Sequence, residues 1–208
     1  MNHLCKALLI GTGVLTGAIA SQAYSAPGTA GIADSRTMKT GRITSQPIGH
    51  YEFCKIHRNE CMAVSKPGPA PRVTEYGWTV VKDVNTKVNF SVMPKTDMEI
   101  FGREEVWAYP DVAGDCEDYV LLKRYMLIER GFSAADLLIT VVRKPDGEGH
   151  AVLTLRSTDG DYILDNLEDT VKPWHDTPYR YLKRQSSDNS GRWVTIENHS
   201  PMFVGSVR

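Results

Sequence analysis

The sequence lacks any excess of charge, any internal repeat, and any long apolar run beyond its first twenty residues. Its 208 residues carry a formal net charge of -1 and no basic stripe, so nucleic acid is not expected as a partner. No later segment is long and apolar enough to cross a bilayer. Because 41% of the residues are hydrophobic and a compact domain has on the order of 100–200 residues, we expect one domain with a real core.

The start of the chain predicts an export signal followed by a flexible arm. Lys6 precedes an apolar run at residues 7–20, and Ser21-Gln22-Ala23 fits the small-x-small rule for signal cleavage. A membrane anchor is the weaker alternative, because the run is short for a span of about 20 apolar residues. Residues 24–46 are rich in Gly, Ser, Thr and Ala, as in a flexible arm. We therefore expect a signal peptide at 1–23, an arm at 24–46, a mature domain at 47–208 and a periplasmic location.

Export changes how the four cysteines are interpreted, because the periplasm is oxidising. Cys5 leaves with the signal, Cys54 and Cys61 are close together, and Cys116 stands alone. A near pair plus one odd thiol is typical of one disulfide and one reactive cysteine. The alternative is a metal site, since four potential ligands fall at helical spacing: His50, Cys54, His57 and Cys61.

The mature chain has helical patterns first and strand patterns afterwards. Thr74 can cap a helix whose apolar face recurs every three or four residues, and Asn85 and Asn89 on that helix are expected to be solvated. A second helix should begin at Asp115 as its N-cap and stop at Gly131. Strands are expected at 137–142, 150–155, 161–165, 179–182 and 192–196. Helices followed by hairpin-linked strands predict an α+β fold with helices on an antiparallel sheet.

The stretch with the most chemical content is Gly114-Asp115-Cys116-Glu117-Asp118-Tyr119. A thiol must become a thiolate to attack, and a helix N-terminus favours that anion. A base must reach the sulfur and a third group must orient the base. His150 and Asp165, on strands expected to be neighbours, are the candidates. Each has a plainer interpretation: a buried apolar cysteine, a satisfied strand histidine, and an aspartate that caps the next segment.

The register of the two strands tests this grouping. A two-residue turn at Asp159-Gly160 places Asp165 opposite Thr154, whereas a turn at residues 157–158 places it opposite His150. Local turn preference favours the later turn. We therefore expect that a Cys116–His150–Asp165 grouping needs the earlier turn or a bulge.

The acidic neighbours of Cys116 oppose thiolate formation. Asp115, Glu117 and Asp118 can simply stabilise the first turn of the helix. Alternatively they bind a calcium ion, which prefers oxygen ligands and would cancel the repulsion. Asp159 or Asp161 could complete such a site.

Taken together, these residues resemble the bacterial transglutaminase-like cysteine peptidases, the family of the LapG-like periplasmic proteases. The resemblance covers roughly Pro47 to Ile196. Its strongest part is residues 114–119, supported by Asn85-x-x-x-Asn89, Trp107-Ala108-x-Pro110, Gly149-His150-Ala151-Val152-Leu153 and Leu164-Asp165-Asn166. The Cys54/Cys61 pair is a departure from the LapG-like pattern.

The resemblance implies a papain-like, transglutaminase-type core with the nucleophile at a helix N-terminus. It makes Cys116 the nucleophile, His150 the general base and Asp165 the orienting carboxylate. It also implies calcium at Asp115 and Glu117, with Asp118 beside them. A protein substrate such as a cell-surface adhesin, and an inner-membrane regulatory receptor, are the implied partners. Two alternatives stay open: a transglutaminase or amidase with the same three residues, and a non-catalytic calcium-binding domain that recognises a protein segment.

Overall fold

A computed structural model of the protein describes residues 36–64 and 68–197. The predicted signal peptide at 1–23 and the first part of the arm lie outside these residues. The helices and 3-10 turns are α1 (Ile48–Ile56), η1 (Arg58–Cys61), α2 (Glu75–Ser91), α3 (Asp97–Phe101), α4 (Cys116–Glu129), η2 (Ala134–Asp136) and η3 (Trp174–Asp176). The strands are β1 (Thr40–Thr44), β2 (Met93–Pro94), β3 (Ala113–Gly114), β4 (Leu137–Arg143), β5 (Gly149–Ser157), β6 (Gly160–Leu164), β7 (Lys172–Pro173), β8 (Arg180–Ser186) and β9 (Asn189–Ile196). None of the described helices has the length and apolar character needed to cross a membrane.

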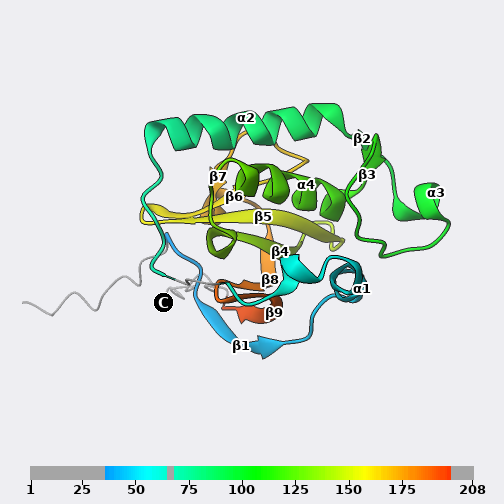
Figure 1. The fold of residues 1–208 in the computed structure, drawn as a ribbon, viewed down its shortest axis with the longest axis horizontal. Coiled ribbons are helices and arrows are strands. Elements are labelled where there is room, and N and C mark those ends of the chain that lie inside the picture. Colours follow the sequence, from blue (N-terminus) through cyan, green and yellow to red (C-terminus); the bar gives the residue numbers. More distant parts are fainter. Residues whose placement is uncertain (1–35, 65–67, 198–208) are drawn as a thin grey trace, which may run out of the picture. The chain divides into compact units, whose positions relative to one another are not determined.

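Seven of the described strands form one sheet in the order β1-β9-β8-β4-β5-β6-β7, with every neighbouring pair antiparallel. Helix α4 packs on this sheet against β5, and helix α2 packs outside α4 (Figure 1). The main core lies between these layers and includes Val84, Leu127 and Leu153, all fully buried. This arrangement confirms the predicted α+β class with helices packed on an antiparallel sheet.

Helix α2 follows directly from its sequence. The Thr74 side chain accepts a hydrogen bond from the backbone N–H of Gly77 at 3.0 Å, which satisfies one of the free donors at a helix start. Val81, Val84 and Val88 are completely buried, as their spacing predicts. This helix therefore forms as the pattern indicates, with its apolar face on α4.

A short parallel pair of strands, β2 and β3, holds the chain just before α4. Met93 pairs with Ala113, and the following residue pairs with Gly114. A Cβ atom on Gly114 would lie 2.7 Å from the side chain of Asp118, so only glycine permits this close approach. The backbone is thereby fixed before Cys116, the first residue of α4.

Helix α4 begins and ends where the sequence predicts, with Asp115 at its N-cap. Asp115 occupies the N-cap position without a side-chain capping hydrogen bond, so its carboxylate is available to other groups. Gly131 has a φ of 89°, the left-handed conformation expected of the residue after a helix end. The helix buries two basic side chains, Lys123 and Arg124, which its sequence pattern did not predict.

Two elements correct the sequence-based expectations. Residues 40–44, assigned to the flexible arm, form the edge strand β1 and pair with β9, so the folded part begins before Pro47. Helix α3 (Asp97–Phe101) lies between the two helices predicted from the sequence, where no helix was predicted. Thr96 and Glu99 form a reciprocal capping box at its start, which stabilises a short helix locally.

The hairpin between β5 and β6 adopts neither of the two registers considered. Ser157 pairs with Gly160 and Leu153 with Leu164, so the two-residue turn lies between the two expected positions. Residues offset by two positions on one face of a sheet remain within reach of long side chains. A side chain at Asp165, just beyond the end of β6, can therefore reach His150 without the earlier turn or a bulge.

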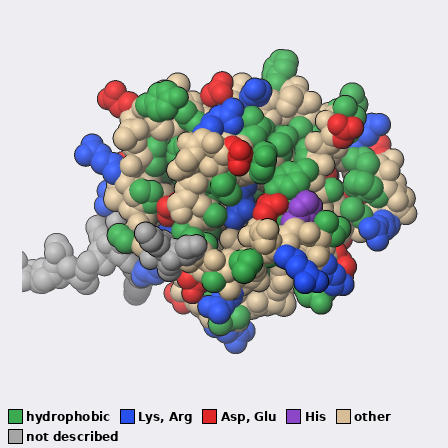
Figure 2. All heavy atoms as spheres, in the orientation of Figure 1, with side chains coloured by type: hydrophobic (Ala, Val, Ile, Leu, Met, Phe, Trp, Pro, Cys, Tyr) green, Lys and Arg blue, Asp and Glu red, His purple; other side chains and the backbone are tan. Residues whose placement is uncertain are grey.

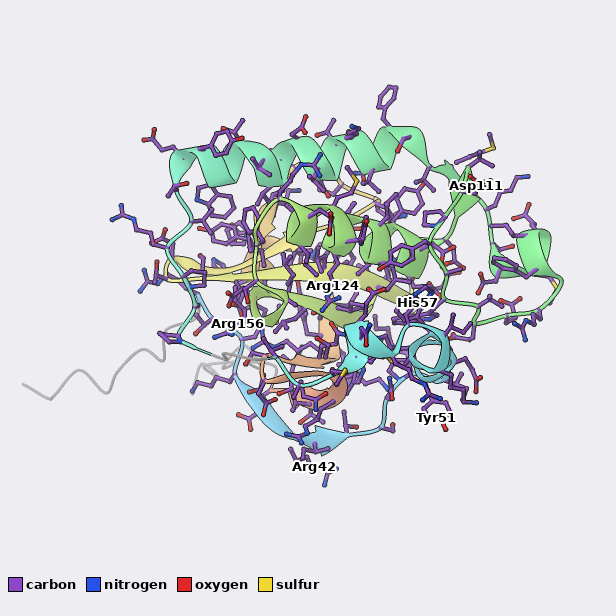
Figure 3. All side chains as sticks on the ribbon, in the orientation of Figure 1. Arg42, Tyr51, His57, Asp111, Arg124 and Arg156 are labelled. Carbon is purple, nitrogen blue, oxygen red and sulfur yellow. A yellow bond between two sulfur atoms is a disulfide. The ribbon has the colours of Figure 1, made fainter. Side chains whose placement is uncertain are left out.

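Cys54 and Cys61 form a disulfide, which confirms the favoured expectation. The metal-site alternative would need the same two sulfur atoms. Glu60, within the disulfide loop, accepts a hydrogen bond from the Tyr109 hydroxyl at 2.5 Å and lies 3.9 Å from the buried Arg124 guanidinium. Figure 3 shows Arg124 between α4 and the α1–η1 segment, so this group ties the disulfide loop to the helix that begins at Cys116.

The surface carries both signs of charge. On the face shown in Figure 2, acidic and basic side chains are interspersed with hydrophobic ones and do not gather into a field of one sign. The mixture agrees with the formal net charge of -1.

Candidate active site

Cys116 opens helix α4 and lines a cavity of about 610 Å³. Its thiol is outside the disulfide and partly exposed. His150, near the start of β5, lines the same cavity, because α4 packs directly on β5. The packing of helix on sheet thus brings together two groups that are far apart in the sequence.

Asp165 holds the imidazole of His150. The His150 Nε2 atom lies 2.8 Å from Asp165 Oδ1, and both side chains are buried. The backbone N–H of Leu167 donates to the same Oδ1 at 3.0 Å, and the Tyr179 hydroxyl donates to Oδ2 at 2.5 Å. Because Nε2 is engaged with Asp165, Nδ1 is the ring nitrogen left for a partner in the cavity.

These contacts keep Asp165 ionised. Burial by itself raises the pKa of this carboxyl, but the hydrogen bond and charge of His150, and the bonds from Leu167 and Tyr179, hold it below its usual value. A carboxylate with a lowered pKa remains a hydrogen-bond acceptor at neutral pH. Asp165 can therefore orient the imidazole and stabilise its protonated form.

Two asparagines of α2 fix the chain that follows Asp165. Asn89 Nδ2 donates to the backbone carbonyl of Asp165 at 2.9 Å and to Asp169 Oδ1 at 2.9 Å. Asn85 Nδ2 donates to the carbonyls of Glu168 and Asp169 at 3.2 and 2.9 Å. The expectation of solvated side chains is wrong for Asn85, which is completely buried. Their spacing of four residues, which places both on one helix face, was the only signal of this role in the sequence.

The protein groups around Cys116 disfavour its thiolate. Burial raises the pKa of the thiol most, followed by the charge and hydrogen bond of Glu117, while a hydrogen bond from the Ala151 backbone N–H lowers it. The Cys116 Sγ–H donates to Glu117 Oε2 at 3.0 Å. A nucleophilic thiolate at this position therefore requires that the negative charge of Glu117 be offset.

A cluster of three carboxylates lies beside the thiol. Asp97, Asp115 and Glu117 each offer an oxygen within 4.8 Å of the others, and all three line the cavity of Cys116. Asp97, at the start of α3, is 1% exposed. Its Oδ1 and the Oδ1 of Asp115 are buried without a hydrogen-bond partner in the described residues. Free carboxylate oxygens that converge in this way are the donor set of a hard divalent cation.

The three clustered carboxyl groups have raised pKa values. Burial, followed by the charge of Glu117, raises the pKa of Asp115 to about 8. Burial also raises the pKa of Glu117 and of Asp97. Asp115 therefore retains its proton at neutral pH, and a bound cation would release it.

Three residues considered as ligands from the sequence, Asp118, Asp159 and Asp161, are not among the clustered carboxylates. Asp118 accepts a hydrogen bond from the backbone N–H of Ala108 at 2.9 Å and is not one of the three clustered carboxylates. Asp161 accepts from the backbone N–H of Met38 and from Arg184, both at 2.9 Å, and Asp159 lies on the β5–β6 turn. Asp97 takes their place. No sequence signal identified it, because it meets Asp115 only through the packing of α3.

The comparisons with known proteins find solved structures to which this chain is similar. Legionella pneumophila LapG in its calcium-bound form is 26% identical, with a TM-score of 0.49, over 62% of this chain and 75% of that chain. The EGTA-treated form of that protein is 25% identical, with a TM-score of 0.48, over 59% of this chain and 69% of that chain. No curated protein matches the sequence.

A family model gives the assignment. The model described as bacterial transglutaminase-like cysteine proteinase matches residues 40–201, which include β1, the free thiol of Cys116 and the His150–Asp165 pair. The match begins at the first strand of the sheet and spans most of the chain. The protein therefore belongs to the family of bacterial transglutaminase-like cysteine proteinases.

Proposed function

We propose that this protein is a calcium-dependent cysteine peptidase of the periplasm, which cleaves a protein substrate with Cys116, His150 and Asp165. The observation that carries the proposal is that the buried His150–Asp165 pair and the free thiol of Cys116 line one cavity. This is the minimum set for nucleophilic catalysis by a thiol: a nucleophile, a base and a group that orients the base.

In the proposed reaction, Nδ1 of His150 takes the proton of Cys116, and the sulfur attacks the carbonyl carbon of a peptide bond. The negative charge that develops on the carbonyl oxygen is stabilised by backbone N–H groups at the start of α4. His150 then protonates the leaving amine, and a thioester remains on Cys116. A water molecule that gives its proton to His150 attacks the thioester, and the acyl group leaves as a carboxylate.

Trp107 contributes to the cavity mainly as a wall. Its Nε1 atom is buried without a partner in the described residues and packs against Gly49, where a Cβ atom would lie 2.6 Å from it. The indole N–H therefore faces α1, and the backbone N–H groups at Cys116 are better placed for the oxyanion.

The residues present fit a calcium ion, since Asp97 and Asp115 each have a buried oxygen without a partner and Glu117 completes a three-carboxylate set. Calcium held there would supply positive charge beside the thiol. In that state, Glu117 would no longer oppose the Cys116 thiolate. The ligand set proposed here is Asp97, Asp115 and Glu117, with Asp118 supporting the loop beside it.

The periplasmic location rests on the signal-peptide pattern of residues 1–23. The substrate class rests on the resemblance of residues 114–119 to the LapG-like proteases, and it is a cell-surface adhesin or another exported protein. An inner-membrane receptor that sequesters the enzyme belongs to the same proposal. A pull-down of such a receptor and cleavage of a co-exported adhesin fragment would test these two partners separately.

The central test uses Cys116→Ala in the full chain with calcium present. Peptide cleavage should be lost, while near-UV circular dichroism and the thermal midpoint stay as in the wild type. Ser186→Ala, a change on β8 away from the cavity, is the matched control and should cleave normally. Residual cleavage by Cys116→Ala would refute the assignment of the nucleophile.

The same preparation separates the alternative activities. A transglutaminase would form the same thioester and transfer its acyl group to an amine. An amidase would use the same three residues to hydrolyse another kind of amide bond. Incorporation of a labelled amine into protein without peptide cleavage would replace the peptidase proposal. A thiol that does not react with an alkylating reagent at neutral pH in calcium would favour a non-catalytic calcium-binding domain.

A further inference from the structure

Trp107, which forms a wall of the Cys116 cavity, lies on a segment that is held on both sides of it. The backbone N–H of Val106 donates to Asp97 Oδ2 at 2.5 Å. The backbone N–H of Ala108 donates to Asp118 Oδ1 at 2.9 Å. Both carboxylates are buried, one at the start of α3 and the other in the first turn of α4. Two helices therefore fix the wall segment, residues 106–108, through its backbone.

The backbone just before the wall segment has an uncommon conformation. Glu105 has a φ of 58°, and it is the only residue other than glycine with a positive φ in the described part of the chain. A side chain in this conformation is strained, and the conformation persists only where the surrounding structure imposes it. The hydrogen bond from Val106 to Asp97 follows Glu105 directly, so the anchoring of the wall segment is placed to impose this conformation.

The position of Asp118 depends on Gly114, two residues before the nucleophile. A Cβ atom on Gly114 would lie 2.7 Å from Asp118 Oδ2, so the carboxylate occupies the space that a side chain there would fill. Its other oxygen, Oδ1, accepts from Ala108. Asp118 therefore connects the strand before Cys116, the first turn of α4 and the wall segment.

The indole of Trp107 packs on α1. A Cβ atom on Gly49 would lie 2.2 Å from Trp107 Cδ1, and the ring of His50 meets the indole edge-on with centroids 5.3 Å apart. The side chain is thus fixed by packing while its backbone is fixed by hydrogen bonds to buried carboxylates. Loss of a backbone anchor would let the wall move relative to Cys116.

We propose that Asp118 is a positioning residue, which fixes the Trp107 wall of the cavity through the N–H of Ala108. This inference rests on the proposed function, in which a peptide substrate occupies that cavity. Asp118 touches no substrate and acts on its binding through the wall segment. Asp97 anchors the same segment, but it also belongs to the proposed calcium ligands, so Asp118 is the residue on which this role can be tested alone.

The first test is Asp118→Ala in the full chain with calcium present. The N–H of Ala108 loses its acceptor and the wall shifts, so KM for a peptide should rise about 10-fold, the upper end for one lost hydrogen bond. The kcat should change little, because the lost interaction serves binding rather than the chemical step. Asp118→Asn keeps a side-chain oxygen for Ala108 and should recover most of the loss. Asp83→Ala, a change of an exposed aspartate on α2, is the matched control and should behave as the wild type.

A second measurement observes the wall itself and needs no turnover. With fluorotryptophan incorporated at the tryptophans, fluorine NMR resolves them, and Trp107→Phe identifies the resonance of residue 107. In Asp118→Ala this resonance should shift, and Asp118→Asn should restore it. The resonances of Trp78 and Trp174, which pack against other rings, should stay in place. A general loss of stability would not move one folded-state resonance selectively.

The outcomes separate this inference from the proposed function. If the wild type cleaves no peptide and the Trp107 resonance still moves in Asp118→Ala, the proposed function fails and the positioning role stands. If Asp118→Ala matches Asp83→Ala in both KM and fluorine spectrum, the inference is overturned.

Hydrogen exchange in the wild type decides the question even if Asp118→Ala does not fold. NMR should find the backbone amide of Ala108 protected, because its N–H is bonded to a buried carboxylate. An Ala108 amide that exchanges as fast as one in an unfolded chain would overturn the inference.

Discussion

The carboxylate of Glu117 should make the thiol of Cys116 harder to ionise, and removal of that carboxylate measures the effect. The Cys116 Sγ–H donates to Glu117 Oε2 at 3.0 Å. Deprotonation of the sulfur would place two negative charges at that separation. Glu117→Gln keeps the shape of the side chain and removes one of them, so the pKa of the thiol should fall.

Coulomb's law bounds the repulsion energy between the Cys116 thiolate and the Glu117 carboxylate. At the 3.0 Å separation of the two atoms, unit charges repel by about 5.5 kcal/mol at an effective dielectric constant of about 20, and by about 1.4 kcal/mol in bulk water. Only the ionised thiol experiences this repulsion, so Glu117 raises the pKa of the thiol and Glu117→Gln should lower it. The partial exposure of Cys116 favours the lower half of this range of repulsion energies.

The assay is the rate of Cys116 alkylation as a function of pH, measured by mass spectrometry of the peptide that contains this residue. In EGTA, the midpoint for Glu117→Gln should lie below that of the wild type. Calcium should lower the wild-type midpoint and should have less effect on Glu117→Gln, which has lost one ligand oxygen of the proposed site. Glu129→Gln, at the exposed end of α4, is the control and should titrate as the wild type does.

Two results would refute this reasoning. A midpoint that is the same in wild type and Glu117→Gln, both in EGTA, would show that Glu117 does not control the thiol. A midpoint that calcium does not move, despite measured calcium binding, would place the ion away from Cys116.

Three further predictions concern the support of the site. Tyr179→Phe removes the 2.5 Å hydrogen bond to Asp165 Oδ2 and should lower kcat about 10-fold. Tyr76→Phe, a change of an exposed tyrosine, is the control and should leave kcat unchanged. Equal kinetics for the two variants would contradict the role of Tyr179. Burial raises the pKa of Asp115 to about 8 and of Asp118 to about 7, so the folded state binds protons that the unfolded state releases. Stability in EGTA should therefore fall as pH rises from about 4 to 8, seen as a decreasing Tm that calcium flattens; a Tm that rises over this interval would show the opposite linkage. The disulfide closes a loop with a sequence separation of 7 residues, so Cys54→Ser/Cys61→Ser should lower the free energy of unfolding by about 2–3 kcal/mol. Urea denaturation measures this change. An unchanged free energy of unfolding would mean that the Glu60–Tyr109 contact holds the loop without the disulfide.

Many of the local features could be predicted from the sequence, because they depend on neighbouring residues. The valine spacing and Thr74 cap of α2, and Gly131 after α4, each act within a few residues. The same holds for Cys116, which stands at a helix start because a helical pattern follows Asp115. His150 and Asp165 could be selected because two adjacent strand patterns carry them. The edge strand β1 could not be predicted, because its five residues are ordered only by pairing with β9.

The remaining parts of the site were decided by tertiary structure. Asp97 joins Asp115 and Glu117 only because α3 packs beside the start of α4. Lys123 is completely buried because other elements pack on α4, although a lysine at this position of an uncovered helix would reach solvent. A sequence pattern specifies which face of a helix or strand is apolar, whereas the distance between two side chains on different elements depends on how those elements pack. The sequence therefore determined which residues carry the chemistry, and the fold determined which carboxylates lie beside the thiol.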